Sequence, residues 1–137
     1  MTAWSAAVEN WPTVWRTTQV SELRTPQRQR ILVFSLALAY GGSEPQTFTF
    51  SNGQRFDFMV LNDQGEELWR WSRSRAFIQM IGEETLAPHE LRIYTALWDG
   101  KDDRGRPLPE GDYFLQAVWT TVPPAASEPV PFHFHGL

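Results

Sequence analysis

Two histidines near the C-terminus are the residues whose type and spacing best suit metal chemistry. His133 and His135 are two positions apart, so on a β-strand both imidazoles project from the same face. A metal would need a third ligand from elsewhere in the chain, either His89 or a carboxylate. The competing interpretation is a solvated edge strand. Because two ligands at this spacing are a weak signal, we predict no metal and no other cofactor.

The acidic segment from Asp99 to Gly105 has the outline of a calcium-binding loop, with Glu110 at its twelfth position. Two residues are incompatible with that site: Lys101 stands at a ligand position, and Arg104 replaces the required glycine. We therefore predict a β-turn whose aspartates accept hydrogen bonds from backbone amides.

Groups suited to hydrolytic catalysis are scarce. The chain has no cysteine, which excludes thiol nucleophiles, disulfides and cysteine-based zinc sites. No serine lies in a G-x-S-x-G motif, and the adjacent Glu83 and Glu84 diverge on either a strand or a helix. We predict that the protein is not an enzyme and has no catalytic residues.

An aromatic and basic cluster, Trp69 to Arg75, is the densest unusual feature of the sequence. Tryptophan and arginine are the side chains that dominate the energetics of protein interfaces. Alternate tryptophans on a hairpin more often fill a core, so we expect Trp69 and Trp71 to pack inward, with Arg70 near solvent. The residues that follow are predicted as a partner-binding surface: Ser72, Arg73, Ser74 and Arg75.

The composition predicts one soluble domain, residues 1–137. The 137-residue chain is 42% hydrophobic and 20% charged, a balance typical of globular proteins. Its net charge is −4 and its basic residues are spread along the chain, so neither nucleic acid nor a membrane is an expected partner. The longest apolar run, Ile31 to Tyr40, is about half of the ~20 residues that a membrane-spanning helix needs. No signal peptide is visible, so we expect a cytoplasmic protein.

Short alternating segments between turn signals predict β-strands. In Ile31 to Tyr40, alternate residues starting at Leu32 form one bulky face; a buried helix is the alternative. Val14 to Val20 is predicted as an edge strand. Further strands are expected at 47–50, 55–61, 66–71, 91–98, 113–120 and 132–135. The predicted fold is all-β, an immunoglobulin-like antiparallel β-sandwich of seven to nine strands.

The turn Asn62 to Gly65 predicts a hairpin between 55–61 and 66–71. A three-residue loop with a glycine bulge would place Asn62 opposite Glu66 and Met59 opposite Trp69. A two-residue loop would shift the pairing by one residue and place Asp57 opposite Arg70.

This hairpin resembles that of the intracellular proteinase inhibitor family, usually called BsuPI-like. The specific part is Phe56-Asp57-Phe58, Gly65 and Leu68-Trp69-Arg70-Trp71-Ser72. A second hairpin, with Trp98, Gly105, Pro107 and Gly111-Asp112-Tyr113, is less specific, because it is similar to one in several immunoglobulin-like modules, including the flagellar hook-capping protein. The resemblance covers about residues 31–119 and implies an immunoglobulin-like sandwich that inhibits intracellular serine proteases by protein–protein contact through surface loops.

The resemblance marks no inhibitory loop. Three stretches suit a rigid exposed loop that fills a protease cleft: Ser72 to Arg75, which we favour, Arg104 to Pro109, and Ala125 to Ser127. The alternative function is a structural or assembly module of the same fold that binds a non-protease protein. Its possible anchors are Trp4, Trp11 and Trp15.

Overall fold

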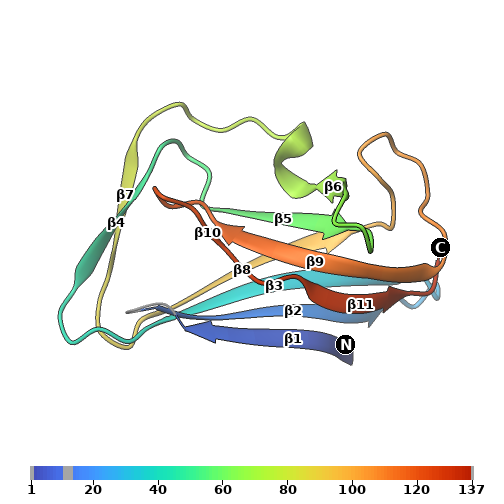
Figure 1. The fold of residues 1–137 in the computed structure, drawn as a ribbon, viewed down its shortest axis with the longest axis horizontal. Helices are drawn as coiled ribbons and strands as arrows, with labels where there is room; N and C mark the ends of the chain where they lie inside the picture. Colours follow the sequence, from blue (N-terminus) through green and yellow to red (C-terminus); the bar gives the residue numbers. More distant parts are fainter. Residues whose placement is uncertain (1, 11–13, 137) are drawn as a thin grey trace.

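A computed structural model describes residues 2–10 and 14–136, and for residues 2–10 it describes the backbone alone. The described part of the chain contains eleven strands and one turn of 3₁₀ helix, η1 (Trp71–Ser74) (Figure 1). The strands are β1 (Thr2–Asn10), β2 (Val14–Arg24), β3 (Arg30–Tyr40), β4 (Gln46–Phe50), β5 (Phe56–Leu61), β6 (Glu67–Arg70), β7 (Gly82–Leu86), β8 (Leu91–Trp98), β9 (Gly111–Trp119), β10 (Ala125–Ala126) and β11 (Val130–Phe134).

The strands form two antiparallel sheets packed face to face. One sheet has the order β1-β2-β3-β8, and the other has the order β10-β9-β5-β6, with β11 also paired to β9. A separate ribbon of β4 and β7 stands at one end of the sandwich, on the left in Figure 1. The all-β sandwich is confirmed. Among the described residues, no helix is long and apolar enough to cross a membrane.

The two packed sheets contain nine described strands, within the seven to nine expected, and β4 and β7 form the separate ribbon. The strands β1, β7 and β10 were not predicted. The prediction that Val14 to Val20 is an edge strand is wrong. β2 extends to Arg24 and lies between β1 and β3, since the backbone of Thr2–Asn10 forms a further strand outside it. Neither β1 nor β7 begins with a turn signal strong enough to have revealed it.

The central strand β3 has the predicted alternation. From Leu32 to Tyr40 its even-numbered side chains, Phe34 among them, are buried, whereas the residues between them are only partly covered. The alternative of a buried helix is wrong. A strand that pairs on both sides, with β2 and β8, leaves no backbone group in its centre without a partner.

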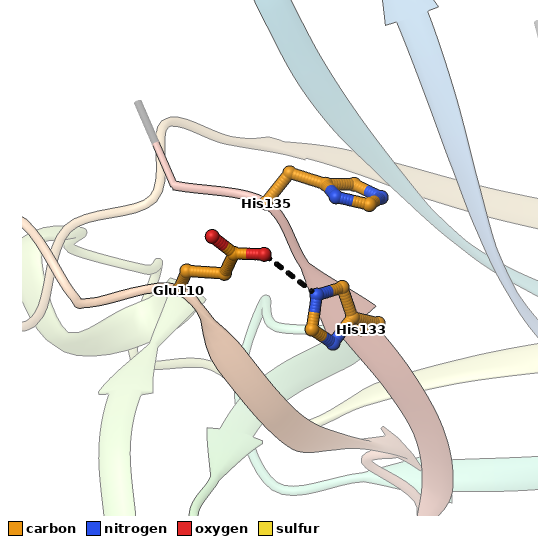
Figure 2. A group of neighbouring side chains, drawn as sticks. All are labelled: Glu110, His133 and His135. Atoms are coloured by element: carbon orange, nitrogen blue, oxygen red, sulfur yellow. Dashed lines mark hydrogen bonds and ion pairs between the residues drawn. The ribbon is translucent and has the colours of Figure 1, made fainter.

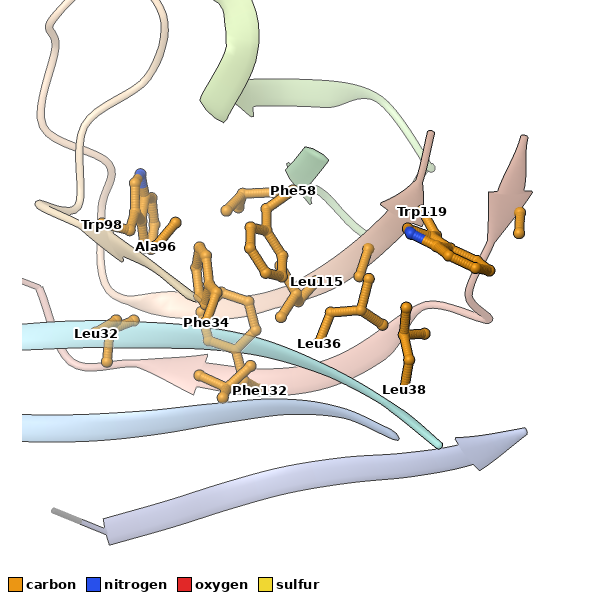
Figure 3. Close-up of a cluster of buried hydrophobic side chains, with 14 of the residues drawn as sticks. Leu32, Phe34, Leu36, Leu38, Phe58, Ala96, Trp98, Leu115, Trp119 and Phe132 are labelled. Carbon is orange, nitrogen blue, oxygen red and sulfur yellow. The ribbon is translucent and has the colours of Figure 1, made fainter. Parts of the chain in front are cut away.

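Aromatic rings fill the space between the sheets. Phe34 is fully buried, and its ring centroid lies 5.8–6.0 Å from those of Phe58, Trp69, Trp98 and Phe132. These partners come from strands of both sheets, so one side chain joins the two layers (Figure 3). Aromatic rings at such separations stabilise the fold by more than the burial of their apolar area alone would.

The turn of the β5–β6 hairpin follows the prediction, but its register does not. The amide of Asn62 donates to the carbonyl of Glu66 at 3.0 Å, as the three-residue loop requires. Leu68 then forms a bulge, so Met59 lies opposite Arg70 and not opposite Trp69. The alternative pairing of Asp57 with Arg70 across the ladder is also absent from the described strands.

The bulge determines where Trp69 points. It places Trp69 opposite Val60, whose side chain faces the core, so Trp69 packs against the core as well. Without the extra residue, Trp69 would share a face with Met59 on the other side of the sheet. The prediction that Trp69 and Trp71 pack inward is thus confirmed.

Replacing Phe34 tests this description of the core. Phe34→Ala is expected to lower the free energy of unfolding by about 3–5 kcal/mol, because it removes a fully buried ring and leaves a cavity. The matched control is Ile93→Ala on β8, where the side chain is 67% exposed, with an expected loss below about 1 kcal/mol. Urea unfolding measures both, and equal losses would contradict the assignment of Phe34 to the core.

Candidate functional site

The predicted partner-binding residues Ser72–Arg75 lie in and just after η1, and a buried carboxylate fixes this segment. Asp57 on β5 is only 3% exposed. Its Oδ1 accepts hydrogen bonds from the amides of Phe58, at 2.9 Å, and Ser72, at 3.1 Å. Its Oδ2 accepts one from the Ser72 hydroxyl, at 2.5 Å, and one from the Arg70 guanidinium, at 3.1 Å. Burying a carboxylate is costly unless its oxygens accept hydrogen bonds. The bonds from Ser72 therefore hold η1 in one position against β5.

An ion-pair network surrounds the first part of the segment. Arg70 donates to both oxygens of Glu67, and Arg73 bridges Glu67 and Asp103. The hydrogen bond from Arg70, helped by that from Arg73, lowers the pKa of Glu67 below its ordinary value of 4.5. The same pairing raises the pKa of Arg70. The two arginines are therefore neutralised locally, although Arg73 remains more than half exposed.

Aromatic stacking fixes the next part. The ring of Trp71 stacks on that of Phe56 at 4.3 Å, and the Arg75 guanidinium lies 4.3 Å from the Trp71 ring centroid. Phe77 also contacts Trp71, with ring centroids 5.9 Å apart. A cation over an indole is attracted by the ring's electron density, so Arg75 is oriented by Trp71 while its charge faces solvent.

The segment after Arg75 exposes large apolar side chains. Ile78, Met80 and Ile81 are 73%, 69% and 72% exposed, on an irregular stretch that runs from η1 to β7 along the top of Figure 1. The carbonyl of Ile78 accepts a 2.7 Å hydrogen bond from the amide of Gly53. A side chain at Gly53 would meet the Ile78 backbone at 3.2 Å, so this close approach favours glycine.

Sequence reasoning missed this stretch, which we call the apolar loop (residues 76–81). Its signal was present: three large hydrophobic residues lie within four positions and follow neither the period of a strand nor that of a helix. Because these residues do not share one side of a strand or helix, they cannot be buried together against the core. The structure thus joins Ser72–Arg75 to a second, apolar half that the prediction did not include.

The other two predicted stretches differ in exposure. Arg104–Pro109 lies in an exposed loop, where Asp102 accepts hydrogen bonds from the amides of Arg104 and Arg106, both at 2.9 Å. This confirms the predicted capping role of an aspartate in that turn. Ala125–Ser127 is wrong as a contact loop. Ala125 and Ser127 are buried, and the Ser127 hydroxyl accepts a hydrogen bond from the Ala117 amide.

The two C-terminal histidines lie where the sequence placed them, on the outer side of an edge strand. β11 buries Phe132 and Phe134 and leaves His133 and His135 exposed. Two carboxylates approach His133, that of Asp112 at Nδ1 and that of Glu110 at Nε2, the latter drawn in Figure 2. His89 is not part of the group; it lies in the turn between β7 and β8 with a φ of +68°.

The proposed tryptophan anchors are only partly described. Trp11 lies outside the described residues, and of Trp4 only the backbone, in β1, is described. Trp15 is 54% exposed on β2, on the outer face of the sheet that also carries the exposed Ile93 of β8. The structure therefore does not bring the three tryptophans together as a described surface.

Comparisons with known proteins gave a match to a protein family and a match to a solved structure. The model of the BsuPI family, described as intracellular proteinase inhibitor, matches residues 19–124. No curated protein matches the chain. The crystal structure of FlgD from Xanthomonas campestris, which concerns the hook capping essential for flagellar assembly, has 14% identity and a TM-score of 0.34. That match covers 71% of this chain and 62% of that chain, so this chain spans less than two thirds of FlgD's length.

Removing the Asp57 charge is expected to loosen η1. Asp57→Asn keeps the volume but replaces one acceptor oxygen with a donor, at an expected cost of about 1–3 kcal/mol in the free energy of unfolding. Trypsin should then cleave after Arg73 and Arg75 faster than in the unmodified protein. The control is Asp63→Asn in the exposed hairpin turn. Unchanged cleavage rates in Asp57→Asn would contradict the anchoring role.

The lowered pKa of Glu67 predicts a pH dependence of stability. A carboxylate whose pKa is lower in the folded than in the unfolded protein stabilises the fold above 4.5, and this contribution is lost as the pH falls through the folded-state pKa. Glu67→Gln removes the titrating group. The stability difference between the unmodified protein and Glu67→Gln should therefore be constant near neutral pH and shrink as the pH falls below 4.5. Urea unfolding at a series of pH values measures it; a difference that stays constant throughout would count against the ion-pair network.

Proposed function

The chain belongs to the BsuPI family of intracellular proteinase inhibitors, and from this premise we propose that it is a non-enzymatic, cytoplasmic protein that binds a serine protease. The proposed contact surface consists of Ser72–Arg75 together with the apolar loop. The observation that carries this choice is the exposure of Ile78, Met80 and Ile81 on a segment that is fixed at its start and near its middle.

Exposed apolar side chains supply the attraction. Each of the three is about 70% exposed, and transferring such a side chain from water into a protease cleft contributes up to about 1.5–3 kcal/mol. Scattered hydrophobic residues are ordinary on protein surfaces, but contiguous ones on a loop are a mark of interaction sites.

Rigidity limits the cost of binding. A loop that is ordered before it binds loses less conformational entropy in the complex, and an inhibitor must also resist cleavage while it occupies the cleft. Asp57 fixes the start of the surface, Trp71 orients Arg75, and the Gly53–Ile78 hydrogen bond holds the loop near its middle. The loop then enters β7, which pairs with β4.

Charge gives the surface its second property. Arg73 is paired with two carboxylates, whereas Arg75 lies over a neutral ring. Among the described side chains, no carboxylate forms an ion pair with Arg75, which therefore offers its positive charge beside the apolar loop. This pairing of a cation with aliphatic side chains fits a cleft that has both an acidic rim and apolar pockets.

A titration of protease activity tests the proposal. Increasing amounts of the purified chain should abolish the activity of a subtilisin-type serine protease at a stoichiometric ratio. Met80→Asp should weaken inhibition at least tenfold, because the charge would be desolvated in the complex. The matched control is Ile93→Asp, at an equally exposed apolar position on β8, which should inhibit as the unmodified chain does.

Two results would contradict the proposal. Rapid digestion of the chain without loss of protease activity would show that it is a substrate. Inhibition that Ile93→Asp abolishes and Met80→Asp leaves intact would place the contact on the outer face of the β2–β3–β8 sheet and not on the apolar loop.

A further inference from the structure

Strand register gathers four polar side chains on one outward face near the C-terminus. β11 runs antiparallel to β9 and places His133 opposite Asp112. Continuing the same register by one step beyond the strands places His135 opposite Glu110. Residues opposite one another in a ladder project from the same face, and the neighbouring Phe134 fills the core. The two histidines and the two carboxylates must therefore share the outer face.

The side chains meet at coordinating distances. One ligand atom from each of Glu110, His133 and His135 can be chosen so that all three lie within 4.8 Å of one another. His133 Nε2 lies 3.2 Å from Glu110 Oε2, and the two imidazole centroids are 4.8 Å apart. Figure 2 shows the Glu110 carboxylate reaching toward His133, with the ring of His135 above that of His133 in this view.

Asp112 contacts the ring nitrogen of His133 that is not the one facing Glu110. Its Oδ1 lies 2.9 Å from Nδ1 of His133, so it accepts a hydrogen bond from that nitrogen when the proton is there. Metal-binding histidines commonly donate their other ring nitrogen to a carboxylate, which orients the ring and leaves the opposite lone pair for the ion. With the Nδ1 proton shared with Asp112, Nε2 faces the Glu110 oxygen at 3.2 Å. This contact is attractive when Nε2 carries a proton, as in an imidazolium, or when a metal ion takes the place of that proton.

We propose that Glu110, His133 and His135 bind a divalent transition-metal ion, with Zn²⁺ the ion that fits the ligand types best, and that Asp112 positions His133. Two imidazoles and one carboxylate form a three-ligand set that leaves a coordination position open. Imidazole nitrogens favour zinc and its neighbours over Mg²⁺ and Ca²⁺, which prefer oxygen. This proposal is independent of protease binding.

The geometry needs only a small adjustment. Bonds of about 2.1 Å in a tetrahedron separate ligand atoms by about 3.4 Å, compared with a largest present separation of 4.8 Å. Glu110, His133 and His135 are all exposed, so side-chain rotation can close that difference without moving the strands. The two nearby carboxylates and the net charge of −4 also favour a cation electrostatically.

Calorimetric titration of the full chain with ZnCl₂ tests the proposal. One equivalent should bind, and His133→Gln should weaken binding at least tenfold. Asp112→Asn, which keeps all three ligands, should weaken it by about tenfold, as expected for an outer hydrogen-bond partner. The matched control is His89→Asn, which changes the remaining histidine of the chain and tolerates its positive φ; it should bind as the unmodified chain does.

A second measurement separates binding from folding. Zn²⁺ should raise the thermal unfolding midpoint of the unmodified chain and of His89→Asn, but not that of His133→Gln, while all three have the same midpoint without metal. Three results would overturn the site: no binding of Zn²⁺, binding that His133→Gln leaves unchanged, or Mg²⁺ binding as tight as that of Zn²⁺.

Discussion

The alternation of side chains along paired strands is the constraint from which both the core and the two surfaces follow. A strand that contributes every second residue to the interior must present the others outward. On β11, burial of Phe132 and Phe134 forces His133 and His135 into solvent. On β8, burial of Trp98 and its alternate neighbours forces the aliphatic residues outward, Ile93 among them. The aromatic core thus fixes which polar and apolar side chains remain available for contact.

Sequence periodicity was enough to predict the fold where local and global preferences agree. β3 has a bulky face at every second position, and the hairpin turn has Asn62 and Gly65 at the positions its loop requires, with Gly65 at a φ of +78°. The bulge at Leu68 was not predictable, because its cause is nonlocal. Trp69 gains contact with Phe34 and Trp98 of the opposite sheet, and no residue near Leu68 records that contact.

The candidate contact surface was half predictable for a related reason. Arginine and serine at 72–75 indicate exposure by their chemistry alone. Ile78 and Met80 are apolar, so their types alone predict burial. Their exposure becomes visible only in the tertiary structure, where side chains from the strands fill the core. Asp57 was predicted only as part of the hairpin, since the donors that surround it come from segments up to fifteen residues away. Such a carboxylate loses its hydration on burial, and its hydrogen bonds to the protein fix the segment that donates them. This suits a loop that must be rigid without packing into the core.

Edge protection alone does not account for the C-terminal cluster. β11 is an edge strand, and exposed edges in natural proteins carry charged side chains or proline, as Pro131 illustrates here. That requirement is met by polar residues on β11 and imposes nothing on the strand across the ladder. Yet Asp112 and Glu110 each contact a ring nitrogen of the same histidine, and His135 lies against that ring. Asp112 on Nδ1 fixes the ring so that Nε2 faces Glu110, the arrangement that a metal-binding histidine needs and that edge protection does not require.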